Sequence, residues 1–425
     1  MRRCADVPVF LNSRVRALLI ILAAAIIIAT PAFGCSAVFL RTQNGWAFAN
    51  NEDWYSSQAF LEVRPPRGEN HGVVGFVVPY GETQSSTIWA LFAAVNDQGL
   101  AFDIFSVAPR QRAEGDGSDD WSWVSEVMEK CATVEEVLEY FSDDWRAQLF
   151  DRQFMYVDAL GDSVIIEDGA IVRGDGDSQI CTNVRQSQFG EGPVNDARYS
   201  VIEKGLRDAG MFDRSLASEL LRQVAQRGGS VKTVYSYIYE SSTDELTLYY
   251  LGNFSEMVRL NVGELTRDGR HTYHIPSMFA YVTAARPGNG SQPAGEAITF
   301  SWNGAPTDYL LSWSTDPSFS DAEPVLIPAD SEQSGTVALA LLLPLAMPAF
   351  GNARRRKWLL LVLLAMALTA CLPDVPREPW EVSQRYRYQA TGFEPGATYY
   401  WRLQTERTDG IVATFDGGAF TIASP

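Results

Sequence analysis

Apolar and polar positions alternate in short runs along the first half of the chain. Runs bounded by turn residues predict strands over 36–40, 45–49 and 89–102, with turns at 43–45 and 96–99. Four further runs have the same character. They predict strands at 154–158, 163–167, 231–239 and 245–251.

Helical spacing occupies the middle of this region. Thr133 and Glu136 form a capping box, in which each side chain binds the other residue's backbone N–H, and they predict a helix over 134–141. Apolar residues three to four positions apart predict two more helices, over 197–209 and 216–226. Strands, then helices, then strands again are typical of a layered α+β domain. We expect such a domain over 35–275.

A second unit follows a segment rich in Pro, Gly and Ser. Residues 276–292 are predicted to be a linker, and β-alternation on both sides of an interruption predicts a β-sandwich over 293–425. Trp302 and the run Phe393–Leu403, which reads FEPGATYYWRL, resemble a fibronectin type III module. The resemblance implies a core Trp that faces a Tyr near the start of a late strand.

Two apolar runs form the interruption, an insertion over 335–373. Each run is about fifteen residues long, shorter than the roughly 20 residues that a membrane-spanning helix needs. The basic residues Arg354–Lys357 separate them. Three interpretations are open. Residues 336–372 form a membrane hairpin with the basic turn on the cytoplasmic side, or they contain a lipoprotein-type signal ending at Cys371, or they are two core helices.

The first 34 residues predict a secretory signal. Basic residues precede an apolar run over 17–28, and the small residues Ala32 and Gly34 favour cleavage between Gly34 and Cys35. We therefore expect an exported protein of the periplasm or cell surface, tethered to the membrane if the apolar insertion enters it. The alternative is a lipoprotein signal with an acylated Cys35.

Composition narrows the classes of function. The net charge of −18 opposes binding to phosphate backbones, so no nucleic-acid partner is expected. Only three histidines are present. His271 and His274, spaced i,i+3 in a strand-like stretch, are interpreted as structural, and no metal or cofactor is expected. After export, Cys131 and Cys181 are either a disulfide or two isolated buried thiols.

A cysteine at a new N-terminus carries its own base. The α-amine has a pKa of about 8 and the thiol one of about 8.5, so the amine can accept the thiol proton without a histidine. Cys35 opens the sequence CSAVFL, and Asn50–Trp54 reads NNEDW, with Asp53 eighteen residues after Cys35. Similar motifs follow in order at 95–101, 156–167, 182–183 and 197–199.

These motifs resemble the N-terminal-nucleophile hydrolases that cleave linear amides, the superfamily of choloylglycine hydrolases, penicillin V acylases and acyl-CoA:penicillin acyltransferases. The resemblance covers about 35–260 and implies a four-layer αββα sandwich. It also implies an enzyme that cleaves a non-peptide C–N bond of a small N-acyl amide, or transfers its acyl group. Tetramers are common in the superfamily, so a homo-oligomer is expected.

The resemblance also assigns roles to residues. Cys35 is the nucleophile, Asp53 orients its α-amine, and Arg198 favours the thiolate by its positive charge. Asn183 Nδ2 and a backbone N–H near Ser106 form the oxyanion hole. From the residues alone, the alternatives are a turn carboxylate for Asp53, an Asx turn for Asn183 and a solvated cation for Arg198.

Asn50 and Asn51 are assigned to substrate contact. Asn50 stands where the bile-salt and penicillin V enzymes have Arg, so one positive charge near the thiol is missing. This departure disfavours bile-salt substrates and favours the acyltransferase side of the superfamily. Two classes of function remain open. One is an exported amidohydrolase, and the other is a non-catalytic envelope lipoprotein or scaffold that keeps the fold, with Cys35 acylated.

Overall fold

The computed structural model describes residues 34–82, 87–108, 122–141, 151–188, 196–295, 297–329, 383–408 and 410–424. The predicted signal up to residue 33 and the apolar insertion lie outside these ranges. The first unit contains the strands β1 (Ser36–Thr42), β2 (Gly45–Trp54), β3 (Phe60–Arg64), β4 (Val73–Glu82), β5 (Thr87–Asn96), β6 (Ala101–Ser106), β7 (Arg152–Val157), β8 (Ser163–Glu167), β9 (Ala170–Arg173), β10 (Ser178–Cys181), β11 (Lys232–Glu240), β12 (Glu245–Tyr250), β13 (Asn253–Asn261) and β14 (His271–His274).

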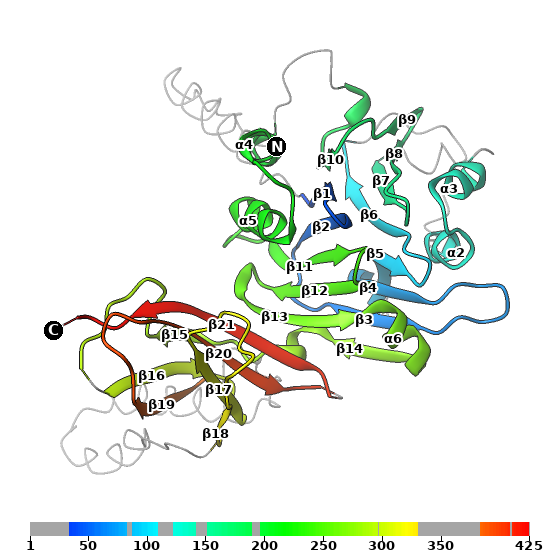
Figure 1. Cartoon of the computed structure of the whole chain (residues 1–425). Coiled ribbons are helices and arrows are strands. Elements are labelled where there is room, and N and C mark those ends of the chain that lie inside the picture. The colour runs from blue at the N-terminus through cyan, green and yellow to red at the C-terminus, as the bar shows by residue number, and fades with distance from the viewer. Residues whose placement is uncertain are drawn as a thin grey trace, which may run out of the picture.

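Helices connect these strands, and a second group of strands follows them (Figure 1). The helices are α2 (Ser122–Lys130), α3 (Val134–Tyr140), α4 (Ala197–Asp208), α5 (Arg214–Val224) and α6 (Val262–Asp268), with short 3₁₀ turns at Gln186–Gln188 and Ile275–Met278. The later strands are β15 (Thr283–Arg286), β16 (Ala297–Gly304), β17 (Tyr309–Ser314), β18 (Val325–Ile327), β19 (Gln384–Thr391), β20 (Thr398–Glu406) and β21 (Val412–Thr421).

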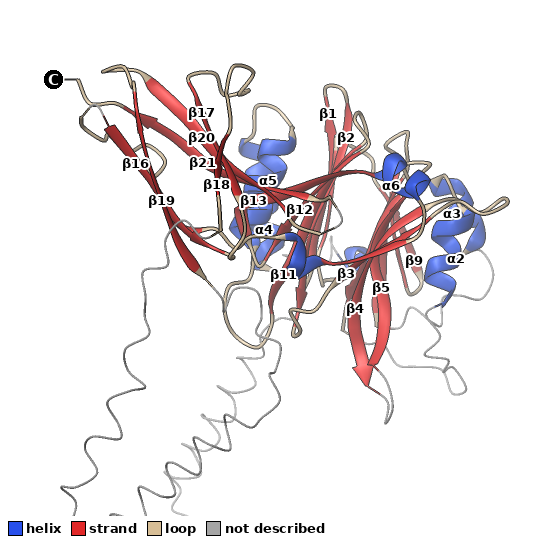
Figure 2. Ribbon diagram, turned by 90° about the horizontal axis from the view of Figure 1, so that it is seen from below, coloured by secondary structure: helices blue, strands red, loops and turns tan. Residues whose placement is uncertain are grey.

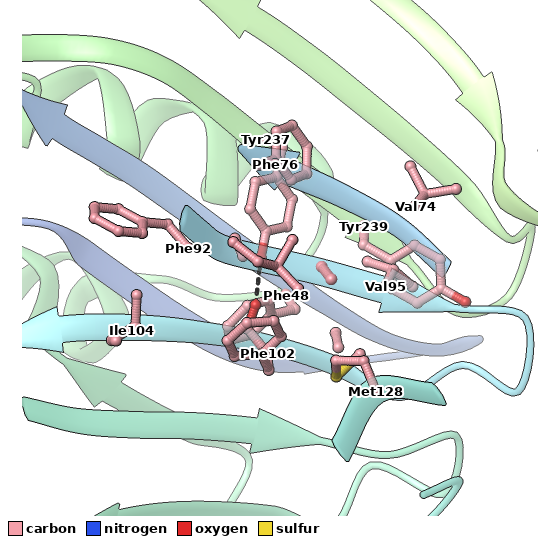
Figure 3. Close-up of a cluster of buried hydrophobic side chains, with 14 of the residues drawn as sticks. Phe48, Val74, Phe76, Phe92, Val95, Phe102, Ile104, Met128, Tyr237 and Tyr239 are labelled. Atoms are coloured by element: carbon pink, nitrogen blue, oxygen red, sulfur yellow. Dashed lines mark hydrogen bonds between the residues drawn. The ribbon is translucent and has the colours of Figure 1, made fainter. Parts of the chain in front are cut away.

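Two antiparallel sheets contain the strands of the first unit, and the larger one continues into the second unit. One has ten strands in the order β10-β1-β2-β11-β12-β13-β21-β20-β17-β18, and the other has eight in the order β14-β3-β4-β5-β6-β7-β8-β9. Their facing surfaces enclose the largest hydrophobic core, part of which Figure 3 shows. Tyr237 of β11 donates a hydrogen bond across it to the Phe102 carbonyl of β6, at 3.2 Å. The space between the sheets is therefore tightly packed around this bond.

Helices cover the outer face of each sheet (Figures 1 and 2). Ala47 and Ala49 of β2 belong to a second core with residues of α4 and α5, whereas Phe48 between them belongs to the inter-sheet core. This alternation follows from the two-residue period of a strand. Helix α2 buries Trp123 and Val127 against the other side of the eight-stranded sheet. The mixed, strand-rich class is the α+β architecture that the periodicity predicts.

The second unit is a β-sandwich. Strands β15, β16 and β19 form a three-stranded sheet that packs on the β17, β18, β20 and β21 end of the ten-stranded sheet, around a separate core. Trp302 is 1% exposed, and its ring stacks on Tyr386 of β19 at 5.3 Å. Tyr399, at the start of β20, packs instead on Phe393 and Phe420. The expected Trp–Tyr contact is thus formed with a tyrosine of a different strand.

A continuous sheet joins the two units. Strand β21 pairs with β13 through the Glu256–Phe415 and Val258–Ala413 partners. Residues 276–292, predicted as a linker, contain strand β15, which pairs with β16. That prediction is wrong for this part of the segment, because β15 completes the three-stranded sheet. The segment as a whole has a composition typical of a loop.

Most predicted elements of the first unit are confirmed with shifted ends. The predicted strand region 89–102 is divided into β5 and β6 by the turn at 97–99. The capping box of Thr133 and Glu136 is present at the start of α3. Strands β3, β4, β9, β10 and β13 and helices α2 and α6 were not predicted. No helix in the described ranges combines the length and the apolar character needed to cross a membrane.

Candidate active site

Cys35 stands immediately before β1, at the open end of the β1–β2 hairpin. The hairpin register pairs Ser36 with Asn51, and continuing it by one residue puts Cys35 opposite Glu52. Opposed residues of an antiparallel pair project from the same face of the sheet. Cys35 belongs to the inter-sheet core, as Phe48 of β2 does. The thiol and the Glu52 carboxyl therefore face the space between the two sheets.

The Cys35 thiol is buried and bonded to a carboxyl group. Sγ donates a hydrogen bond to Glu52 Oε1 at 3.1 Å, and the residues are 6% and 0% exposed. Burial raises the pKa of the Cys35 thiol well above its usual value, and any negative charge on Glu52, Asp103 or Asp53 raises it further. The backbone N–H of Asp53 donates to Sγ and acts in the opposite direction. In the uncut chain the thiol is therefore held as neutral S–H.

Asp53 lies on the opposite face of β2, toward α4 and α5. Its Oδ1 accepts a hydrogen bond from Thr233 Oγ1 at 2.5 Å, and its Oδ2 accepts one from Gln226 Nε2 at 2.7 Å. Arg198 Nη1 is 3.7 Å from Oδ2. Burial raises the pKa of Asp53 to about 7, although all three partners lower it. This carboxyl therefore changes its charge near neutral pH.

Helix α4 presents Arg198 through its N-terminal cap. Asp196 is the N-cap residue: its Oδ1 accepts from the Arg198 backbone N–H at 2.8 Å, and its Oδ2 accepts from Arg198 Nη2 at 2.9 Å. Arg198 Nη2 also donates to Asn183 Oδ1, and Nη1 donates to the Cys35 carbonyl, both at 3.1 Å. Burial raises the pKa of Asp196, but the Arg198 charge and hydrogen bonds outweigh it, so that the pKa is lowered. The guanidinium thus holds Cys35, Asn183 and α4 together.

Gly34 lies inside this network. Its carbonyl oxygen accepts hydrogen bonds from Arg198 Nη1 and, at 3.4 Å, from Gln226 Nε2. A Cβ added at residue 34 would lie 2.1 Å from Asn183 Oδ1 and 2.3 Å from Arg198 Nη1. A side chain at residue 34 would therefore require the ends of the Asn183 and Arg198 side chains to move. The peptide bond that is predicted to be cut is therefore surrounded by the predicted site residues.

Asn183 and Ser106 meet, but not through the expected atoms. Asn183 Nδ2 donates to the Ser106 carbonyl oxygen at 2.7 Å. The contact joins the end of β6 to the loop after β10 and fixes the Asn183 amide plane, since Oδ1 is bonded to Arg198 at the same time. The predicted contribution of Ser106 was a backbone N–H, whereas the observed contact uses its carbonyl group.

The side chain of Asn51, predicted to contact substrate, is bonded to other parts of the protein. Its side chain is fully buried, donates to the Leu221 carbonyl at 2.8 Å and accepts from Ser236 Oγ at 2.6 Å. It therefore attaches β2 to α5 and β11. Asn50 is also fully buried, and it faces the inter-sheet space, where its side-chain atoms have no hydrogen-bond partner within the described ranges. Neither side chain is exposed at a surface.

The histidines lie in other parts of the fold, whereas Cys181 of β10 lies opposite Ala37 of β1, near the network. His274 bonds to Ser277 and Gln58, both at 2.8 Å, and His271 Nε2 is 3.3 Å from Asp268. Cys131 and Cys181 are both buried and not linked by a disulfide, so the interpretation as isolated thiols is the one that applies.

Two acidic side chains of the site were missed by the sequence interpretation. Glu52 has a sequence signal, because a hairpin that turns at 43–44 puts it opposite Cys35. Asp103 has a weaker one, since it is a lone carboxylate within the apolar strand β6 and is completely buried. Gln226 and Asp196 carry no signal that separates them from ordinary polar residues.

The site therefore brings Cys35, Asp53, Asn183 and Arg198 into one hydrogen-bonded network, although they lie far apart in the sequence. Among the described residues, no three His, Cys, Asp or Glu side chains are grouped so that they could hold a metal ion. Comparison of the chain with protein-family models and with curated proteins gives no match.

Proposed function

We propose that the chain is an exported cysteine amidohydrolase of the N-terminal-nucleophile class, which cleaves the C–N bond of a linear, small-molecule N-acyl amide. The observation that carries the proposal is the convergence of Cys35, Asp53, Asn183 and Arg198 around the Gly34–Cys35 peptide bond. The motifs that resemble this class contain these same residues. The order of helices, sheet, sheet and helices supports a four-layer αββα sandwich.

Removal of residues 1–34 would complete the site. Cleavage leaves a free α-amine on Cys35, beside the Arg198, Gln226 and Asp53 side chains that surround the Gly34 carbonyl in the uncut chain. The same cleavage removes the Gly34 carbonyl, so Arg198 and Gln226 lose the acceptor that they bind in the uncut chain. The α-amine of Cys35 can then accept the proton of the Cys35 thiol, so the reaction needs no histidine as a base.

The proposed reaction begins with attack of Cys35 Sγ on the amide carbonyl carbon. The thiol proton moves to the α-amine, and the amine then gives a proton to the leaving nitrogen as the C–N bond breaks. Asn183 Nδ2 is the oxyanion donor, a contribution worth about 3 kcal/mol in related acyl transfers. Water attacks the thioester, the carboxylic acid leaves, and the thiol re-forms. An amine in place of water gives acyl transfer.

Burial of the thiol bears on the alternative function. An envelope lipoprotein would carry a diacylglyceryl group on Cys35 Sγ, yet Sγ is enclosed between the sheets and bonded to Glu52. Lipidation therefore requires this end of the hairpin to leave its position. The observation favours a free Cys35. The sandwich of the second unit, which resembles fibronectin type III, extends the same sheet and is proposed as a structural part of the enzyme.

Two measurements test the proposal. Intact mass and N-terminal sequencing of the exported protein should give a chain that begins with an unmodified Cys35, and a diacylglyceryl adduct there would contradict it. A panel of N-acyl amides is then incubated with the processed protein, with mass detection of both products. We expect cleavage by the wild type and a loss with Cys35→Ser. Cleavage that survives this substitution would assign the nucleophile elsewhere.

A further inference from the structure

A group of polar side chains lies between the sheets beside Cys35 and has no part in the mechanism above. Glu52 of β2, Asp103 of β6 and Tyr235 of β11 are each 0% exposed. Within the described ranges, Glu52 Oε2, Asp103 Oδ2 and the Tyr235 hydroxyl have no hydrogen-bond partner. Buried polar atoms of this kind carry an energetic cost, and native proteins retain them mainly where they serve a function.

Glu52 is the member of this group that touches the reacting atom. Its Oε1 accepts the Cys35 S–H at 3.1 Å, and it stands opposite Cys35 across the hairpin. Because Oε2 has no partner in the described part of the chain, the carboxyl group can exchange its two oxygens about the Cγ–Cδ bond without breaking any other hydrogen bond. The thiol can therefore be offered either an acceptor or, from a protonated oxygen, a donor.

Charge decides which form of Glu52 suits the reaction. Within the described ranges, the groups that act on Glu52 are Cys35, Asp53 and Asp103, and none of them is a cation. Arg198 binds Asp53 and Asp196 instead. An ionised Glu52 would repel a thiolate at Cys35, whereas a neutral carboxyl group can donate a hydrogen bond to it.

We propose that Glu52 is a catalytic residue of the amidohydrolase, and that it acts as a neutral carboxylic acid which donates a hydrogen bond to the Cys35 thiolate. The inference rests on the proposed function. In the resting state, S–H donates to Oε1 and the carboxyl proton is on Oε2. When the thiol proton moves to the α-amine, the carboxyl group turns and Oε2–H donates to Sγ. Glu52 keeps its proton throughout, so the proton count of the reaction is unchanged.

The environment of the carboxyl group agrees with a neutral form. Burial raises the pKa of Glu52 well above its usual value; the hydrogen bond from the Cys35 thiol opposes this rise, and the Asp53 charge adds to it. The titratable groups that face Glu52 are Cys35 and Asp103, together with the phenols of Tyr235 and Tyr237, while Asp53, its neighbour in the chain, acts from the opposite face of β2. Burial likewise raises the pKa of Asp103, where Glu52 is the next cause. Two adjacent buried carboxyl groups cannot easily both be ionised.

Two substitutions separate this role from its rivals. Glu52→Gln keeps the shape, cannot ionise and retains an N–H donor, whereas Glu52→Leu keeps the approximate volume without a donor. On the processed enzyme, we expect Gln to keep amide cleavage within about 10-fold of the wild type and Leu to lose about 100-fold or more, or about 2.7 kcal/mol. Glu240→Gln, at the far end of the same β2–β11 strand pair, is the matched control and should change neither rate.

A second readout does not depend on the substrate. The rate of Cys35 alkylation by iodoacetamide, followed against pH, reports the thiolate directly, and Glu52→Leu should lower it at neutral pH while Glu52→Gln should not. If Glu52→Gln lowers the rate as much as Glu52→Leu does, Glu52 acts as a carboxylate base and the proposal is wrong. If Leu keeps the wild-type rate, Glu52 has only a packing role. Altered alkylation in a protein that cleaves no amide would reject the proposed function and retain the thiol–carboxyl interaction.

An infrared measurement protects the test against variants that fail to fold. A neutral buried carboxyl group gives a C=O stretch separate from that of carboxylates, and the wild type should show such a band at neutral pH. Blocking Cys35 with iodoacetamide should shift the band, because Glu52 would lose its sulfur partner. A spectrum without a protonated carboxyl band, or with one that is indifferent to the block, would refute the proposal on the wild-type protein alone.

Discussion

Glu256 should be the residue on which the junction between the two units depends most. It is 2% exposed on β13, and its carboxyl oxygens accept three consecutive backbone N–H groups, from Ala280, Tyr281 and Val282. These residues lead into the second unit, and β13 itself pairs with β21. Glu256→Ala would leave all three buried donors without their acceptor.

The magnitude follows from the number of donors. A buried donor that loses its partner costs about 1–3 kcal/mol, so three cost roughly 3–9 kcal/mol. A cavity of about 310 Å³, lined by Tyr250, Phe279 and Glu256 itself, adjoins the site and can admit water to the freed N–H groups. We therefore expect the lower part of this range, about 3–5 kcal/mol, which is a large share of the 5–15 kcal/mol that stabilises a typical domain.

The sign of the pH dependence can also be stated. Burial raises the pKa of Glu256 from 4.5 to about 7, although the three N–H groups oppose the change. The folded state therefore binds the proton more tightly than the unfolded chain. This contribution is complete below about pH 4.5 and is lost as the pH rises through about 7, by roughly 3 kcal/mol in all. Glu256→Gln should remove that part of the slope.

Chemical denaturation at about pH 5 and at about pH 8 measures both effects. Because Asp53 has a raised pKa of the same sign, the quantity to compare is the difference in slope between the wild type and Glu256→Gln. The exposed Glu264→Ala is the control and should cost less than about 1 kcal/mol. A Glu256→Ala protein as stable as this control, with unchanged hydrogen exchange in β13 and β21, would show that the three hydrogen bonds do not hold the junction.

Two further predictions concern the network around Cys35. Gly34→Ala keeps a small residue at the predicted cleavage site but puts a Cβ against Asn183 and Arg198, so thermal unfolding of the uncut chain should show a loss of about 1–3 kcal/mol. Gly176→Ala, where a Cβ meets nothing within 4 Å, is its control, and equal stability of the two variants would contradict the described position of Gly34. Arg198→Ala leaves Asp53 and Asp196 without their cation, and we expect a loss of about 3 kcal/mol in stability together with a fall in kcat/KM for amide cleavage. Arg198→Lys should not restore the activity, because a compact ammonium group lacks the two separate Nη atoms through which the guanidinium reaches Asn183, Asp196 and the Cys35 carbonyl; full rescue by Lys would reduce the role of Arg198 to that of a simple charge.

Much of the first unit could be predicted because its signals are local. The capping box at Thr133 needs only residues within one helical turn, and the strands on both sides of the turn at 43–45 follow from alternation and turn chemistry. The insertion at 335–373 was recognised from composition alone, and its structure lies outside the described ranges. Strand β15 was missed because its four residues, three of them exposed, show no alternation and lie next to a Pro and Gly-rich segment.

In the candidate site too, the features that could be predicted are those with a local signal in the sequence. The eighteen-residue spacing from Cys35 to Asp53 brings the two residues to adjacent strands, since one hairpin connects them. That hairpin also places Glu52 opposite Cys35. This pairing could have been predicted from the sequence, but it was overlooked. Asn51 was assigned to substrate contact, and the same motif does not reveal that its face of β2 is covered by α5.

By itself, the sequence determined the elements with short-range periodicity, the hairpin that carries Cys35, and the acidic, histidine-poor composition that favours a nucleophile with its own base. Only the tertiary structure decided that Asn183 and Arg198 meet Cys35, that Asp103 faces the thiol from the other sheet, and that β21 continues the sheet of the first unit. The physical reason is that strand and helix periods act over a few residues, whereas the packing of two sheets and the pairing of distant strands depend on the burial of surfaces contributed by the whole chain.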